Sequence, residues 1–315
     1  MRYYVQAGCG GLAVAVHSTQ FEIRKPEHGL FHPILELASQ TLDGALEGSG
    51  RDFSKIAGVC GDTRQAVTEA GMARELGYHA VLASVAAFRD RSEEEVLQHC
   101  RTVSEVLPLV GFYLQPAAGG RLLSYRFWRE FAEIGNAVAI KIAPFDRYQT
   151  LDVVRAVVES GRKDLALYTG NDDNIVVDLL TPFRFRTPQG IAERRIAGGL
   201  LGHWGVWTRA AVELFQRIRT ARESGVLTAE WLDTATAVTD MNAALFDAAN
   251  SFAGCIPGIL EVLRRQGLVP TSLCLNPHET LSPGQADELS RVAAAYPQLV
   301  DDDFVKENLD TWLSA

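Results

Sequence analysis

The first two thirds of the chain alternate short apolar runs with amphipathic segments of helical length. The apolar runs are rich in Val, Ile, Leu and Ala and show little polar alternation, which is typical of parallel strands covered by helices. Seven runs of this kind predict seven strands: Leu12–His17, Ser54–Cys60, His79–Ser84, Leu109–Leu114, Ala137–Ile142, Leu165–Thr169 and Arg195–Gly199.

The segments between these runs carry helix signals. Arg64–Leu76 has small apolar residues recurring on one face. Ser92–Val106 opens with a serine cap and places Glu95 at the capping-box position. Leu151–Ser160 ends before Gly161, which fits a C-terminal cap. Repeated strand–helix units of about 25–30 residues predict a parallel sheet, either a closed barrel or an open doubly wound sheet.

Past residue 210 the pattern changes to helices with short breaks. The predicted helices are Ala210–Ser224, Thr228–Asn250, Gly254–Gln266 and Pro283–Ala295. We therefore expect two regions, a (β/α) barrel domain over residues 1–222 and a C-terminal helical region over residues 223–315.

Composition narrows the class of protein. The net charge of −9 is dispersed, and no basic stripe is interleaved with aromatics, so nucleic acid is not an expected partner. The five cysteines are scattered and never spaced as C-x-x-C, and the sequence has no H-E-x-x-H motif. The apolar runs are too short to cross a bilayer, and the first residues carry no signal-peptide core. These patterns predict a cytoplasmic protein without a metal or a membrane partner.

Lys141 is the most informative single residue. It interrupts Ala137–Ala143, a run in which every other residue is apolar. Lysine is almost never fully buried without a task or a partner, and desolvation favours the neutral amine that can attack a ketone. The alternative is a lysine at a strand end that pairs with Asp146 or emerges into water.

Other candidates follow neighbouring strands. Tyr113 lies at the end of its run, where a phenol could act as general acid and base, or could pack at the rim of the core. The hydroxyls of Ser18 and Thr19 could hold a carboxylate, or could cap the next helix. Asp172 and Asp173 could line a site or bind Mg²⁺, although Asp173 could equally cap a helix.

In chain order these pieces resemble the dihydrodipicolinate synthase / N-acetylneuraminate lyase family of class I aldolases. Lys141 resembles the family's Schiff-base lysine, and Tyr113 with Pro116 resembles its Y-x-x-P motif. The family's G-T-T-G-E segment and its G-D-D segment also have counterparts here: Ser18, Thr19 and Glu22 for the first, Gly170 and Asp172 for the second. The resemblance implies a (β/α)8-type TIM barrel with a C-terminal helical extension.

The chain also departs from the family pattern. Only about ten residues precede the strand that leads to Ser18, so we expect the first strand of the barrel to be missing, which predicts a gap or a distorted closure. The arginine that follows Y-x-x-P is replaced by Ala117-Ala118, with Arg121 nearby but displaced. Phe88 stands where the family has its relay tyrosine. Strict dihydrodipicolinate synthase activity is therefore not expected.

The resemblance implies a Schiff-base lyase or aldolase acting on pyruvate or another 2-oxo acid, without a cofactor or metal. Lys141 would form the imine, Tyr113 would move protons, and Ser18, Thr19 and Gly170 would contribute to substrate binding. A homo-oligomer, dimer or tetramer, is expected. Two alternatives stay open: a non-catalytic family descendant with a binding or regulatory role, and an unrelated Mg²⁺-dependent enzyme that uses Asp172 and Asp173.

Overall fold

The computed structural model describes residues 1–116 and 119–314. These residues cluster into two compact units. The first unit consists of Met1–Phe53, Asp172–Val176 and Leu201–Ala315, and the second of Ser54–Asn171 and Val177–Leu200. The division into residues 1–222 and 223–315 expected from the sequence stays a prediction.

The second unit is built on a parallel sheet. Its strands run in the order β2 (Ser54–Val59), β3 (Ala80–Ala83), β4 (Leu109–Leu114), β5 (Ala137–Ala143), β6 (Ala166–Thr169) and β9 (Gly198–Gly199). Each neighbouring pair is parallel. The predicted α/β class with a parallel sheet is confirmed.

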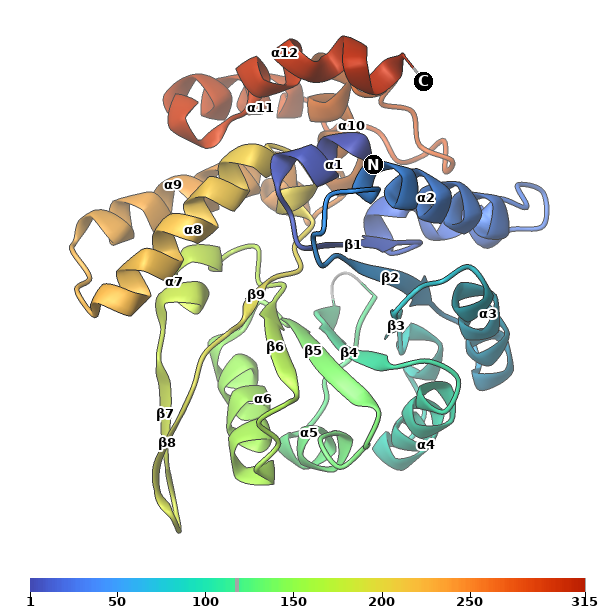
Figure 1. The fold of residues 1–315 in the computed structure, drawn as a ribbon, viewed down its shortest axis with the longest axis vertical. Helices are drawn as coiled ribbons and strands as arrows, with labels where there is room; N and C mark the ends of the chain where they lie inside the picture. Colours follow the sequence, from blue (N-terminus) through green and yellow to red (C-terminus); the bar gives the residue numbers. More distant parts are fainter. Residues whose placement is uncertain (117–118, 315) are drawn as a thin grey trace. The chain divides into compact units, whose positions relative to one another are not determined.

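The helices of this unit cover one face of its sheet (Figure 1). They are α3 (Thr63–Glu75), α4 (Glu93–Ser104), α5 (Tyr125–Phe131) and α6 (Arg147–Ser160). An open doubly wound sheet carries helices on both faces, whereas a barrel carries them on the outside only. This arrangement therefore favours the barrel over the open sheet, the two alternatives that the hydrophobic pattern left open.

Two local signals in the sequence are confirmed. Ser92 caps α4 with a complete capping box, in which its hydroxyl accepts from the Glu95 amide and the Glu95 carboxylate accepts from the Ser92 amide. Gly161 ends α6 in the left-handed conformation, with φ of 76°. Both devices satisfy backbone groups that have no partner within the helix.

The last predicted strand is shorter than expected, and a hairpin precedes it. Of the segment Arg195–Gly199, only Gly198–Gly199 forms a strand. The antiparallel hairpin of β7 (Phe183–Thr187) and β8 (Gly190–Arg194) was not predicted, because neither strand is a continuous apolar run. Of the five residues predicted for the seventh strand, only two join the sheet.

The first unit begins with α1 (Arg2–Ala7), β1 (Gly11–Val14) and the short 3-10 helices η1 (His17–Thr19) and η2 (Phe21–Arg24). A long helix that was not predicted, α2 (Phe31–Leu46), follows. All seven predicted runs thus contain a strand, six in the second unit and β1 in the first. The expected gap or distorted closure between the first and last strands stays a prediction.

The remainder of the first unit is helical, as expected past residue 210. Its helices are α8 (Thr208–Ser224), α9 (Glu230–Leu245), α10 (Cys255–Arg265), α11 (Gln285–Ala295) and α12 (Asp302–Leu313). A buried Tyr3 ties the first helix to this group: its hydroxyl donates to Asp301 at 2.7 Å, and its ring lies 5.5 Å from that of Trp312. No helix of the residues described is long and apolar enough to cross a membrane.

Candidate active site

Lys141 lies on β5 in the middle of the second unit's sheet. Its side chain is half-buried, and the alternate residues on its face of the strand are the small Ala139 and Ala143. Ile140 and Ile142 point to the opposite face and are fully buried. The strand therefore gives one face to the core beneath the helices and carries Lys141 on the other.

Residues of the two adjacent strands share this face with Lys141. Residues that pair directly across parallel strands point to the same side of the sheet, and Lys141 pairs with Phe112 of β4 and with Tyr168 of β6. The Lys141 Nζ lies 4.7 Å from the centroid of the Phe112 ring. The lysine is thus flanked by two aromatic residues on one surface, which we call the Lys141 face.

Gly170 makes space for the lysine side chain. A β-carbon at this position would lie 2.7 Å from Lys141 Cε and 2.9 Å from Ala143 Cβ. Real side chains do not approach so closely, so any larger residue would displace Lys141. Gly170, which the sequence singled out as a binding residue, therefore shapes the space around Lys141 by having no side chain.

Tyr113 lies on the other face of the sheet. Its register partner is Ile142, and its ring packs 5.3 Å from that of Trp128 on α5. The hydroxyl donates to the Leu123 carbonyl and accepts from the Leu123 amide, both at 3.2 Å. Burial raises the pKa of this phenol. The structure therefore does not bring Tyr113 together with Lys141, contrary to the convergence expected from the family motif.

A second observation confirms which face α5 covers. A β-carbon on Gly111, two residues before Tyr113, would lie 2.6 Å from Phe131 of α5. Alternate residues of a strand share a face, so Gly111 and Tyr113 both point toward this helix. Phe112 between them points to the Lys141 face.

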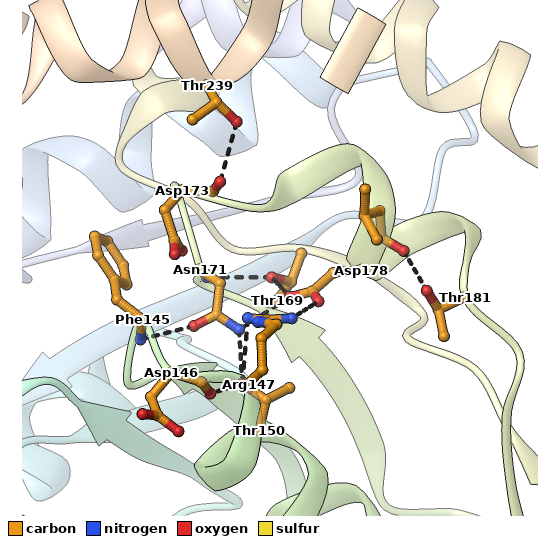
Figure 2. Close-up of polar contacts among 11 residues, drawn as sticks. Phe145, Asp146, Arg147, Thr150, Thr169, Asn171, Asp173, Asp178, Thr181 and Thr239 are labelled. Atoms are coloured by element: carbon orange, nitrogen blue, oxygen red, sulfur yellow. Dashed lines mark hydrogen bonds and ion pairs between the residues drawn. The ribbon is translucent and has the colours of Figure 1, made fainter. Parts of the chain in front are cut away.

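A polar network fixes the loops that follow β5 and β6 (Figure 2). The side-chain oxygen of Asn171 accepts from the backbone amide of Phe145 at 3.0 Å. The side-chain nitrogen of Asn171 donates to the Asp178 carboxylate at 2.9 Å. Thr169 donates to the same Asp178 carboxylate at 2.7 Å. Arg147 forms an ion pair with the buried Asp178. Because Asn171 follows Gly170 directly, this network fixes the backbone at the edge of the Lys141 face.

The hydroxyl pair expected to bind the carboxylate belongs to the first unit. Ser18 and Thr19 lie in η1, and Glu22 lies in η2. All three side chains are half-buried. Their expected convergence with Lys141 of the second unit stays a prediction.

The aspartates of the alternative Mg²⁺ hypothesis both lie in the first unit, with different surroundings. The buried Asp172 carboxylate accepts from the His203 amide at 2.9 Å. Asp173 is exposed, and its backbone carbonyl accepts from Thr239 at 3.0 Å (Figure 2). Within residues 1–116 and 119–314, no three His, Cys, Asp or Glu side chains gather as a metal site would require.

Phe88 and Arg121, which mark departures from the family pattern, contact other residues of their own unit. The Phe88 ring packs 4.5 Å from that of His99. The Arg121 guanidinium donates to the carbonyls of Phe88 and Arg91, at 2.6 and 2.7 Å. Arg121 therefore stabilises the segment around Phe88. Ala117 and Ala118, which replace the expected arginine, lie outside the described residues.

One residue of the Lys141 face was missed by the sequence analysis. Tyr168 is half-buried and lies two residues before Gly170, so both point to the same side of β6. The signal was present in the sequence, because the G-D-D-like segment already places Gly170 at the site. Counting back two positions from that glycine leads to Tyr168.

Known proteins are similar to part of this sequence and to most of its fold. The model of the Dihydrodipicolinate synthetase family matches residues 44–182. A curated 4-hydroxy-tetrahydrodipicolinate synthase of Aromatoleum aromaticum is 34% identical over 120 residues, which are 37% of this chain and 39% of that protein. In the curated relatives found, the matched segment spans 39% to 47% of the relative's length.

Solved structures match a larger part of the chain. The dihydrodipicolinate synthase of Thermotoga maritima has a TM-score of 0.73 at 19% identity, covering 94% of this chain and 90% of that one. The chloride-inhibited enzyme of Acinetobacter baumannii, complexed with pyruvate, has a TM-score of 0.70 at 18% identity, covering 94% and 89%. This likeness confirms the barrel-type α/β fold. Residues 44–182, which match the model of the Dihydrodipicolinate synthetase family, contain both Lys141 and Gly170.

Proposed function

We propose that this protein is a class I lyase or aldolase that forms a Schiff base between Lys141 and a 2-oxo acid such as pyruvate. One observation carries the proposal. Lys141 stands half-buried on a strand of apolar residues, and its side chain packs against Gly170, where any β-carbon would collide with it. Such a lysine offers an amine, the group that can attack the carbon of a ketone.

The chemistry follows from the amine and its surroundings. The neutral amine attacks the ketone carbon, and loss of water from the carbinolamine gives a protonated imine. The imine withdraws electrons from the neighbouring carbon, so that C–C cleavage or loss of a proton yields an enamine. Phe112, Ala139 and Ala143 share the Lys141 face with the amine.

Similarity to named proteins supports the substrate class. The Acinetobacter baumannii relative was solved with pyruvate, and so was an Escherichia coli prophage protein of the same family. Ser18 and Thr19 are proposed to bind the substrate carboxylate. A cytoplasmic homo-oligomer without a cofactor stays our expectation.

Borohydride reduction in the presence of pyruvate tests the proposal, because only an imine is converted to a stable adduct. We expect wild-type protein to gain the mass of the reduced adduct. Lys141→Ala and Lys141→Arg should gain none, since arginine keeps the charge but supplies no neutral amine at ordinary pH. Lys163→Ala, at an exposed position, is the matched control and should react like wild type. Equal labelling of Lys141→Ala would refute the assignment.

A second candidate is a family descendant that binds a 2-oxo acid without turning it over. It is favoured by Tyr113, whose hydroxyl is committed to the Leu123 backbone. Such a protein would still be trapped by borohydride if Lys141 forms the imine. It would not exchange the C3 protons of pyruvate with solvent, so proton exchange measured by NMR separates the two candidates.

A further inference from the structure

We propose that Tyr168 is the group that moves protons to and from the substrate imine, in place of the tyrosine of the Y-x-x-P segment. The proposal rests on the function proposed above, in which Lys141 carries the imine. It assigns a catalytic role to a residue that the family motif does not include.

Successive side chains along β6 point to opposite faces of the sheet. Thr169 points away from the Lys141 face, because its hydroxyl donates to the buried Asp178 at 2.7 Å. Gly170 points toward that face, because its missing side chain would meet Lys141. Since successive residues alternate, Tyr168 points toward the Lys141 face as well. Its direct pairing with Lys141 across β5 and β6 gives the same result independently.

Tyr113, the tyrosine of the Y-x-x-P segment, is not placed to act on an imine at Lys141. Tyr113 has a relative exposure of 1%, lies on the face covered by α5, and satisfies both hydrogen-bonding functions of its hydroxyl on Leu123. To reach Lys141 it would have to leave Trp128 and cross to the opposite face of its own strand. Tyr168 needs no such change, and its side chain is half-buried rather than packed beneath a helix as Tyr113 is.

The end of β6, which carries Tyr168, is held rigidly. A group that moves protons must be held in place relative to the reacting atom. Thr169 and Asn171, which follow Tyr168 closely, are both fully buried and both donate to Asp178. The end of β6 is thereby fixed to α7 (Ile175–Leu180), and Tyr168 is held beside Lys141.

Two proton transfers through Tyr168 complete the imine and then form the enamine. The Tyr168 phenol gives its proton to the carbinolamine hydroxyl, which leaves as water while the nitrogen lone pair forms the C=N bond. The resulting phenolate takes a proton from C3, and the electron pair of that C–H bond forms the C=C bond of the enamine as the imine nitrogen becomes neutral. The phenol is regenerated, and no oxidant or reductant is consumed.

Proton exchange at C3 of pyruvate in D₂O, followed by NMR, tests the assignment. Tyr168→Phe should keep the borohydride adduct on Lys141 but exchange C3 protons about 100-fold more slowly or worse, the usual effect of losing a general acid–base group. Tyr113→Phe, the matched control on the other face, should exchange at close to the wild-type rate.

Three results separate the possibilities. Unchanged exchange in a folded Tyr168→Phe protein, or a loss confined to Tyr113→Phe, overturns the role of Tyr168 and leaves the Schiff base intact. Wild-type protein that gives no adduct with any 2-oxo acid overturns the proposed function itself, and Tyr168 with it. Tyr168→Met is measured in parallel, with folding followed by circular dichroism, so that misfolding of one variant does not decide the outcome.

Discussion

Gly170 and Lys141 compete for the same space: a β-carbon on Gly170 would lie 2.7 Å from Lys141 Cε. This contact joins the G-D-D-like segment to the lysine on the adjacent strand. It shows that the glycine is required by a side chain on β5 and not by its own backbone conformation, since its φ is not in the left-handed region.

Gly170→Ala should therefore displace Lys141 and slow borohydride trapping with pyruvate. We expect overpacking to lower the free energy of unfolding by about 1–3 kcal/mol. Gly111→Ala is the matched control, because its β-carbon would lie 2.6 Å from Phe131 on the opposite face of the sheet. It should lose similar stability, measured by urea unfolding, but keep the wild-type trapping rate. Equal trapping rates in the two variants would contradict the contact's importance.

Tyr113→Phe should lower stability without abolishing activity. The change removes the hydroxyl that bonds both backbone groups of Leu123 and leaves a buried amide without its acceptor. An unsatisfied buried group costs about 1–3 kcal/mol, measured here by chemical denaturation. Tyr148→Phe, at a tyrosine with a relative exposure of 82%, is the control and should be neutral. A stable but inactive Tyr113→Phe protein would restore the role expected from the family motif.

Asp178→Asn should destabilise the end of β6. The buried carboxylate accepts from Thr169 and Asn171 and pairs with Arg147. Hydrogen bonds to a charged group are worth about 1.5–3 kcal/mol each, so a loss of at least about 2 kcal/mol is expected in urea unfolding. Asp152→Asn breaks the exposed pair with Arg155 and should cost less than about 1 kcal/mol. Similar losses in both variants would show that the network does not hold β6.

His99 should make the protein less stable in mild acid. Burial lowers the pKa of this imidazole from 6.5 to about 4. As the pH falls below 6.5, the unfolded chain takes up a proton that the folded chain refuses until about pH 4. The free energy of unfolding contributed by His99 is therefore constant above pH 6.5 and decreases between pH 6.5 and about 4.

The comparison of wild type with His99→Phe isolates this contribution. Urea unfolding measured from pH 4 to 7 should show a flatter dependence in the variant, by on the order of 3 kcal/mol over that window. His278→Gln, at an exposed histidine, should follow the wild-type curve. Parallel curves for wild type and His99→Phe would mean that His99 titrates alike in the folded and unfolded chains.

The sequence predicted the parallel strands well because each is a continuous apolar run between helix signals. The limits of β4 were predicted to the residue, Leu109–Leu114. The hairpin of residues 183–194 was missed, because charged residues interrupt both of its strands. The helix α2 was missed because its N-cap residue, Leu30, has no side chain that can accept a hydrogen bond from the first turn.

The candidate site was predicted less completely, for a reason of register. Lys141 and Gly170 could be found as an isolated polar residue and a motif glycine. Which of Phe112 and Tyr113 shares the face of Lys141 depends on how β4 pairs with β5, and a shift of one residue exchanges the two. The same register brings Tyr168 to the Lys141 face, so the sequence could name the lysine but not its aromatic neighbours.

The central claim is that Lys141 forms the imine, and the site of borohydride labelling tests it most directly. The chain has five lysines that can compete for pyruvate: Lys25, Lys55, Lys141, Lys163 and Lys306. Reduction with pyruvate, digestion and mass spectrometry of the peptides assigns the adduct to one of them. We predict the reduced adduct on the peptide that contains Lys141, and its loss in Lys141→Ala. An adduct on another lysine, or none with any 2-oxo acid tested, would contradict the account.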